Sequence, residues 1–147
     1  MLDGNPEDRA AIDVLVRRFF DAFTNAGGIV PDTEGLAGLF LESAVISKAV
    51  AGLETYAVHS FIEPRAKLLT DGNLVDFREE ETESRTDIVG SIAQRISLYR
   101  KSGTMMGERF EGRGVKVFQL VRAAGGWRIA ALAWDDERDG FSIPASL

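Results

Sequence analysis

The hydrophobic pattern of the chain changes its period near residue 73. Before that point, apolar residues recur three and four positions apart, as they do on the buried face of an amphipathic helix. The clearest stripe consists of Ile12, Leu15, Val16, Phe19, Phe20 and Phe23. After that point, apolar and polar residues alternate over long runs, which is typical of strands with one face toward a core. The pattern therefore predicts an α+β fold in which the helices precede most of the sheet.

Residues that favour helix ends give the predicted helices their bounds. Asn5, which is followed by a proline, can cap the first helix, and Gly27-Gly28 would end it. A short second helix is expected after a cap at Thr33. The sequence of a capping box opens the third helix, which is expected over Ser60–Leu69.

Two short segments and four long ones are predicted as strands. The short ones form a hairpin, and the whole set is Ala44–Val50, Leu53–Val58, Leu74–Val89, Ile92–Lys101, Gly114–Arg122 and Trp127–Glu137. The expected order of elements is therefore α-α-β-β-α-β-β-β-β. The glycine-rich stretch from Ser102 to Gly114 is interpreted as a mobile loop near the edge of the sheet. A four-residue loop before Trp127 would place Phe118 opposite Ala131.

Both faces of the last predicted hairpin are largely apolar. One face would carry Phe118, Leu120, Trp127, Ile129, Ala131 and Ala133, and the other would carry Val115, Val117, Val121, Leu132 and Trp134. An antiparallel sheet usually buries one face and exposes the other to water. We therefore expect the helices against one face and a second copy against the other, as a homodimer through the outer sheet face.

Composition narrows the class of protein. The 147 residues suit a single domain, 1–147, and the formal net charge of −6 without a basic cluster disfavours nucleic-acid binding. The longest apolar run, Ile129–Trp134, is too short to cross a membrane, and the first residues lack the pattern of a signal peptide. A cytoplasmic protein is therefore expected. With no cysteine and one histidine, thiolate and multi-histidine metal sites are excluded.

Three segments of the chain resemble the nuclear transport factor 2-like superfamily, which includes ketosteroid isomerases and SnoaL-type polyketide cyclases. These segments are the amphipathic helix 10–23, the stretch LAGLFLESAVI at 36–46 and the closing strand GWRIAALAW at 126–134. The resemblance implies a cone, in which a curved antiparallel sheet wraps around three N-terminal helices and opens to an apolar pocket. Dimers through the outer sheet face are common in this superfamily. Its enzymes usually work through a carboxylate base and hydrogen-bond donors inside the cone.

Two residues are candidates for a catalytic base. His59 is the only histidine, and an imidazole is well matched to neutral pH; the alternative is a residue that packs beside a helix N-terminus. Asp135 follows Trp134, and an indole can raise the pKa of a neighbouring carboxyl by desolvation. The alternative for Asp135 is an acid at the point where the strand returns to water.

The second long strand carries two candidates for ligand binding, Arg95 and Tyr99, on one face. Inside the cone they would hold a carboxylate or enolate oxygen, whereas the alternative is an ion pair between Arg95 and a glutamate of the preceding strand. The acidic run Glu79–Glu83 is interpreted as a solvated strand. The aromatic residues expected to line or fill the pocket are Phe19, Phe23, Tyr56, Phe61 and Trp134.

Three functions remain open at this stage. The favoured one is a homodimer whose pocket binds a small apolar or amphipathic molecule with one polar end. The second is a cofactor-independent isomerase, cyclase or dehydratase that abstracts a proton next to a carbonyl, with Asp135 or His59 as the base. The third is a non-catalytic protein-interaction module with a filled cone. No metal or organic cofactor is expected in any of them.

Overall fold

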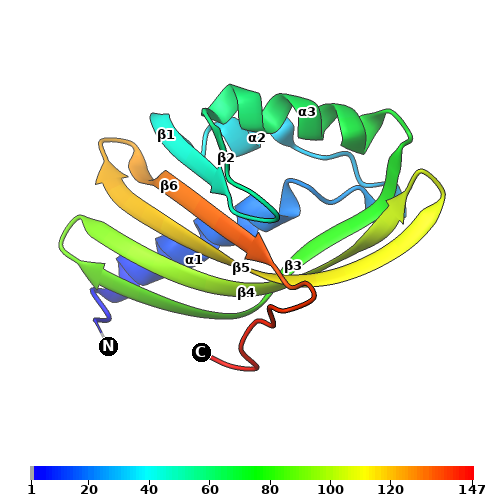
Figure 1. Cartoon of the computed structure of the whole chain (residues 1–147). Helices are drawn as coiled ribbons and strands as arrows, with labels where there is room; N and C mark the ends of the chain where they lie inside the picture. The colour runs from blue at the N-terminus through cyan, green and yellow to red at the C-terminus, as the bar shows by residue number, and fades with distance from the viewer. Residues whose placement is uncertain (1) are drawn as a thin grey trace.

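The chain folds into three helices packed on a curved sheet of six strands (Figure 1), as described for residues 2–147 by a computed structural model. The helical segments are α1 (Pro6–Asp21), a 3-10 turn η1 (Ala26–Gly28), α2 (Thr33–Ala37) and α3 (Val58–Thr70). The strands are β1 (Phe40–Lys48), β2 (Glu54–Tyr56), β3 (Leu74–Val89), β4 (Ile92–Met105), β5 (Glu108–Ala123) and β6 (Gly126–Asp136). The predicted α+β class and the predicted order of elements are confirmed.

The sheet has the strand order β2-β1-β6-β5-β4-β3. Neighbouring strands are antiparallel except for β1, which runs parallel to β6. In Figure 1 the long strands bend around α1, and α2 and α3 lie over the other end of the same face. The helices and the inner face of the sheet therefore enclose one hydrophobic core.

Helix α1 begins as the sequence predicts but ends earlier. The Asn5 side chain accepts a hydrogen bond from the backbone N–H of Asp8 at 2.8 Å, and the apolar stripe of the helix is buried. The helix ends at Asp21, before the predicted stop at Gly27-Gly28, which lies in η1. The cause is Asn25. Its side-chain amide donates to the backbone carbonyls of Leu69 in α3 and Leu74 in β3, and it accepts a hydrogen bond from the backbone N–H of Phe77 in β3. These tertiary hydrogen bonds hold the backbone out of the helix.

Helix α3 begins two residues earlier than predicted, at Val58, with Ala57 as its cap. The Ser60 hydroxyl accepts from the backbone N–H of Ala57 at 3.0 Å and donates to the Ala57 carbonyl at 3.1 Å. Ser60 thus hydrogen-bonds to the backbone of the N-cap residue from the first turn of the helix and is not itself the cap. The preceding strand β2 is correspondingly shorter than the predicted Leu53–Val58.

The glycine-rich stretch is part of the sheet, and its interpretation as a mobile loop was wrong. Strands β4 and β5 continue as a paired ladder up to Met105 and Glu108. They are joined by a two-residue turn, Met106-Gly107, in which both residues have positive φ, as hairpin turns of type I′ require. The glycines of β5 are therefore strand residues, and their missing side chains leave space on the inner face of the sheet.

A bulge in β6 corrects the predicted pairing of the last hairpin. Leu120 faces Ile129 as predicted, but Phe118 faces Leu132, because Ala130 is an extra residue between the two pairs. A one-residue slip exchanges the two faces of a strand. Leu132 and Trp134, predicted on the outer face, are therefore buried against the helices, at 2% and 8% exposure.

The outer face of the sheet keeps a smaller apolar area than the sequence suggested. Val45, Ile92 and Val117 are exposed there, while Leu98 is buried. The C-terminal tail returns across this side, where the backbone N–H of Leu147 donates to Glu83 at 3.2 Å. Within residues 2–147, no helix is both long enough and apolar enough to cross a membrane.

Candidate functional site

A cavity of about 170 Å³ opens between the helices and the inner face of the sheet. Its lining residues come from α1 and the residues just after it, from α3 and from five strands: Phe19, Phe23, Lys48, Phe61, Arg65, Glu79, Tyr99, Lys101, Lys116 and Trp134. For comparison, an apolar cavity of about 150 Å³ binds benzene. The cavity therefore has room for about one six-membered ring.

Aromatic side chains form one wall of this cavity. The Phe19 ring lies at the centre, with edge-to-face contacts to Phe23 at 5.2 Å and to Phe118 at 5.2 Å between ring centroids. The Phe61 ring lies 5.7 Å from Trp134 and 6.1 Å from Phe23. These rings come from α1, α3, β5 and β6, so the wall depends on tertiary packing.

Four cationic side chains line the same cavity. The Lys116 ammonium lies 2.9 Å from a carboxylate oxygen of Glu79, and the Lys101 ammonium lies 2.8 Å from Asp136. The Arg65 guanidinium stacks over the Phe61 ring at 4.3 Å and donates to a backbone carbonyl of its own helix. Lys48 makes no ion pair with any other described residue. Cations therefore outnumber acids around this cavity, although the whole chain carries a net charge of −6.

A row of three residues across β4, β5 and β6 forms the polar floor. Tyr99 pairs with Gly114, which pairs with Asp136, and the Tyr99 hydroxyl reaches over Gly114 to hydrogen-bond the Asp136 carboxylate. A Cβ on Gly114 would lie 2.5 Å from the ring carbon that bears the hydroxyl and 2.6 Å from an Asp136 oxygen. This close approach is the reason that only glycine fits at position 114.

Burial and charge shift the pKa values of the floor and of Lys116. Burial lowers the pKa of the Lys116 ammonium, against the opposing effect of Glu79. Burial and the neighbouring carboxylates raise the pKa of Tyr99, so its hydroxyl stays protonated. Burial would raise the pKa of Asp136, but the hydrogen bonds from Lys101 and Tyr99 outweigh it and lower the pKa.

Arg95 lies on the inner face of β4 but outside this cavity. Its guanidinium donates to Glu81 through two nitrogens, at 3.1 and 2.6 Å, and to Asp13 of α1 at 2.5 Å. The Thr86 hydroxyl accepts a further bond from it at 3.2 Å. Burial would lower the pKa of Arg95, but these bonds raise it. The alternative reading of Arg95, an ion pair with a glutamate of the preceding strand, is the arrangement observed.

The other sequence-predicted residues divide between the cavity and its surroundings. Phe19, Phe23, Phe61, Tyr99 and Trp134 line it together. Tyr56 lies beside them, 6.2 Å from the Phe61 ring. His59 is exposed on α3, and the Asp135 side chain binds Arg138 at the end of β6. The structure therefore does not bring His59 and Asp135 to the cavity.

None of the charged residues of the cavity was predicted from the sequence as a site residue. A bulge at Thr82 in β3 divides the acidic run, so Glu79 and Glu81 point inward and Glu83 points outward. The solvated interpretation of this run is wrong for Glu79, whose side chain is only 10% exposed. The inward position of Lys116 could have been predicted, because Lys116 lies two and four positions before Phe118 and Leu120 on the same strand, and those two residues were predicted on the inner face.

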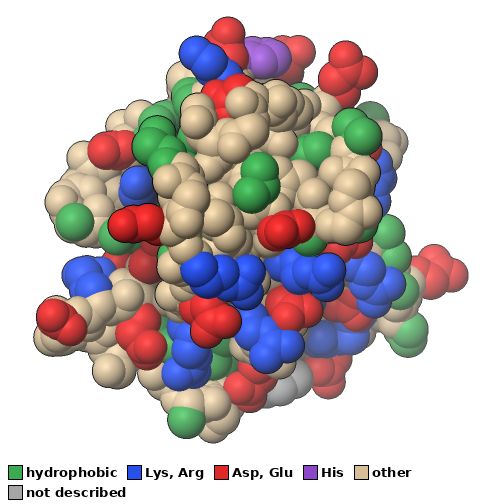
Figure 2. All heavy atoms as spheres, turned by 90° about the vertical axis from the view of Figure 1, so that its right-hand side faces the viewer, with side chains coloured by type: hydrophobic (Ala, Val, Ile, Leu, Met, Phe, Trp, Pro, Cys, Tyr) green, Lys and Arg blue, Asp and Glu red, His purple; other side chains and the backbone are tan. Residues whose placement is uncertain are grey.

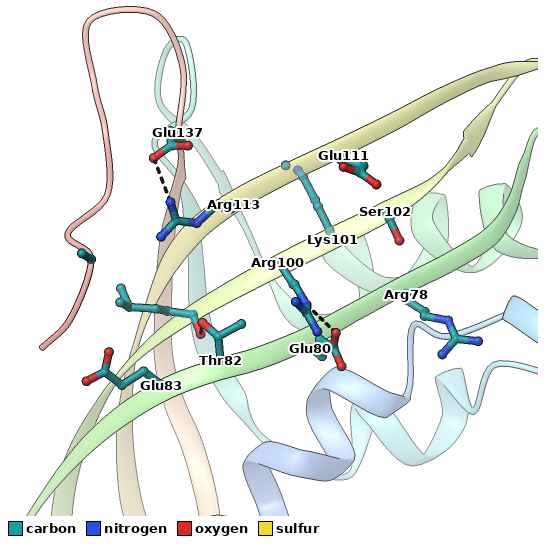
Figure 3. Close-up of a pocket in the computed structure, with 13 residues that line it drawn as sticks. Arg78, Glu80, Thr82, Glu83, Arg100, Lys101, Ser102, Glu111, Arg113 and Glu137 are labelled. Carbon is teal, nitrogen blue, oxygen red and sulfur yellow. Dashed lines mark hydrogen bonds and ion pairs between the residues drawn. The ribbon is translucent and has the colours of Figure 1, made fainter.

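A larger hollow, of about 790 Å³, lies on the outer face of the sheet. Figure 3 shows the charged side chains that line it, with Glu80 paired to Arg100 and Glu137 to Arg113. Figure 2 shows a band of interleaved basic and acidic side chains on the side where the β4–β5 hairpin ends. Without an aromatic wall, this hollow is a solvated charge network, and the smaller cavity is the better candidate site.

The chemistry of the cavity is that of organic cations and one carboxylate. Among the described residues, no group of three or more histidine, aspartate or glutamate side chains could hold a metal ion. The side chains that line the cavity can hold an anion beside an aromatic ring and can donate hydrogen bonds, and the Glu79 carboxylate can accept a proton.

Comparison with solved structures identifies the fold. A candidate aromatic ring hydroxylase from Novosphingobium aromaticivorans is 22% identical over 91% of this chain and 92% of that chain, with a TM-score of 0.75. An NTF2-like protein with a cystatin-like fold from the same species is 20% identical over 92% and 85%, with a TM-score of 0.70. A candidate dehydratase of the NTF2-like family from Streptomyces avermitilis is 14% identical over 91% and 99%, with a TM-score of 0.73.

The chain thus has the cystatin-like fold of the nuclear transport factor 2-like proteins, which confirms the resemblance drawn from the sequence. No protein-family profile and no curated protein sequence matches the chain. Likeness at these identities concerns the fold, and unrelated activities occur on one fold. Function has to be argued from the cavity itself.

Proposed function

We propose that this protein binds a small organic acid with one ring, with the ring against the aromatic wall and the carboxylate among the cavity cations. The observation that carries the proposal is the local reversal of charge. Even without Lys116, whose pKa is lowered by burial, Lys48, Arg65 and Lys101 line the cavity against Glu79, and Asp136 adds one further acid through its pair with Lys101. An excess of partly buried positive charge is stabilised by an anionic ligand.

The size of the cavity limits the ligand. Sites for drug-sized molecules usually measure about 300–1,000 Å³, whereas this cavity measures about 170 Å³. A ligand with several fused rings would have to displace Phe19 or Trp134, which are 1% and 8% exposed. The third function left open by the sequence, an interaction module, assumes a filled cone, and a cavity of this size does not fit that assumption.

Isothermal titration calorimetry with benzoate, benzyl alcohol and benzylamine tests the proposal. Benzoate is expected to bind, and to bind more weakly as the salt concentration rises, because screening weakens ion pairs. The neutral alcohol lacks a partner for the cations, and the amine is repelled by them. Equal binding of all three compounds, or binding of none, would overturn the proposal.

Variants of Lys48 sharpen this test, because Lys48 has no ion pair within residues 2–147 whose loss could unfold the chain. Lys48→Met keeps an unbranched side chain and is expected to weaken benzoate binding by about tenfold, about 1.4 kcal/mol, which is close to the lower end of the range for one hydrogen bond to a charged group. Lys67→Met is the matched control, since Lys67 is an exposed lysine of α3. An equal effect of the two variants would argue against the cavity as the binding site.

The homodimer predicted from the sequence is part of this proposal. Its support is the exposed apolar area on the outer face, where Val45, Ile92 and Val117 are 52%, 61% and 41% exposed on three different strands. A two-fold pair would cover this area on both copies at once. The cavity opens on the other face of the sheet, so such a pair would leave it accessible.

A further inference from the structure

Lys116 is set apart from the other lysines by its depth in the cavity. Its side chain is 7% exposed, and its ammonium nitrogen lies 4.0 Å from the centre of the Tyr99 ring and 5.1 Å from that of Trp134. The rings of Phe19 and Phe20 lie at 6.0 and 5.9 Å. The nitrogen is thus held among four aromatic rings and still lines the cavity.

The groups that face this nitrogen come from several elements. Glu79 on β3 and Asp136 on β6 favour its charged form, while Lys101 on β4 opposes it; Tyr99 stays neutral. Arg65 of α3 and Lys48 of β1 line the same cavity and add positive charge. Burial dominates, and the pKa of Lys116 is lowered. A lysine that is desolvated near other cations is the kind that proteins use as a neutral amine.

We propose that Lys116 is a nucleophilic amine that forms an imine with a one-ring aldehyde bound in the cavity. This inference rests on the proposed function for the placement of the ring and its carboxylate. It adds a covalent step and a substrate class, a carboxylated aromatic aldehyde.

The step needs no reagent besides the aldehyde. The neutral nitrogen attacks the carbonyl carbon, a C–N bond forms, and the electron pair of the C–O π bond moves to oxygen. Glu79, 2.9 Å from the nitrogen, accepts a proton from it and returns that proton to the oxygen. Loss of the second N–H proton and of the hydroxyl then releases one water molecule and leaves the C=N bond. No atom is oxidised or reduced.

Reductive trapping tests this step on the folded protein. The protein is incubated with 4-carboxybenzaldehyde and sodium cyanoborohydride, and the modified lysines are identified by peptide mass spectrometry. The chain contains four lysines, at positions 48, 67, 101 and 116. Because burial lowers the pKa of Lys116 and a lower pKa raises the neutral fraction of an amine, Lys116 is expected to react several times faster than Lys67 at neutral pH. Equal labelling of Lys116 and Lys67 would overturn the inference.

A pH series on the unmodified sequence keeps the test independent of any folding defect. The labelling rate of Lys116 is expected to level off at a lower pH than that of Lys67, because burial lowers the pKa of the Lys116 ammonium. Parallel pH profiles for the two lysines would contradict the proposal. Lys116→Met should abolish the fast labelling, and Lys67→Met should leave it unchanged.

Benzoate separates this inference from the proposed function. If benzoate binds in calorimetry and protects Lys116 but not Lys67 from labelling, both proposals are supported. If benzoate binds and Lys116 labels as slowly as Lys67, the imine step fails alone. If Lys116 labels fast but benzoate neither binds nor protects, the binding proposal fails and the reactive amine stands.

Discussion

The floor of the cavity depends on glycine at position 114, and Gly114→Ala tests that dependence. A Cβ at this position would lie 2.5 Å from a Tyr99 ring carbon and 2.6 Å from an Asp136 oxygen. Neither neighbour can move away freely, because Tyr99 is 1% exposed and Asp136 is held by Lys101. The substitution must therefore crowd the floor and break the hydrogen bond between Tyr99 and Asp136.

The expected loss of stability follows from these two effects. Crowding of a well-packed core costs about 1–3 kcal/mol, and a hydrogen bond to a charged group contributes about 1.5–3 kcal/mol. Replacing a strand glycine recovers about 0.5–1 kcal/mol of chain entropy. Gly114→Ala should therefore destabilise the protein by about 2–5 kcal/mol. For a chain of this size, about 2–4 °C of melting temperature corresponds to each kcal/mol, so a fall of roughly 4–20 °C is expected.

Gly112→Ala is the matched control, on the same face of the same strand. A Cβ there would meet only the flexible Lys101 side chain, at 3.2 and 3.6 Å. Its effect on the free energy of unfolding should stay within about 1 kcal/mol, with stabilisation allowed by the entropy gain. Urea unfolding monitored by tryptophan fluorescence gives both values. If the two variants differ by less than about 0.5 kcal/mol, the described contact at Gly114 is not what shapes the floor.

Three further results are expected from changes elsewhere in the chain. Asn25→Ala removes three hydrogen bonds to backbone groups and should lower the free energy of unfolding in urea by about 2–4 kcal/mol. Its control, Asn73→Ala at an exposed turn, should lower it by less than about 0.5 kcal/mol. Similar losses in the two variants would count against the role of Asn25. The lowered pKa of Asp136 means that its carboxylate stabilises the folded state above about pH 4 and that this stability is lost as the pH falls through the lowered value. The difference in urea midpoint between the original protein and Asp136→Asn should therefore shrink in acid, and a constant difference would contradict this. Light scattering should give a dimer for the original protein and a monomer for Val117→Lys, which places a charge on the exposed outer face.

Much of the fold was predictable because its signals are local. The change of hydrophobic period depends only on neighbouring residues. It gave the correct class, the correct order of elements and the presence of four long strands, although β4 and β5 extend further toward each other than predicted. Asn5 acts as a cap through its own side chain and the next turn, so its role is also visible in the sequence. The failures begin where a residue is engaged by a distant segment, as Asn25 is by α3 and β3.

The candidate site was only half predictable. Five aromatic residues named from the sequence line the cavity. Phe19 and Phe23 belong to the apolar stripe of the first helical segment, whereas Trp134 points inward only through the bulge at Ala130. Its charged residues were missed, since a charge in a strand usually indicates a solvated face. The carboxylate near Trp134 was placed one residue too early: Asp136, not Asp135, points inward to Tyr99.

Composition and periodicity by themselves thus determined the helices, the strands and the aromatic content of the interior. Only the tertiary structure decided which charged groups meet inside. Single extra residues at Thr82 and Ala130 shift the alternation of β3 and β6, and these shifts are defined by the pairing of each strand with its neighbour. The room for Tyr99 over Gly114 is likewise a property of three adjacent strands, because no single strand contains both the gap and the side chain that fills it.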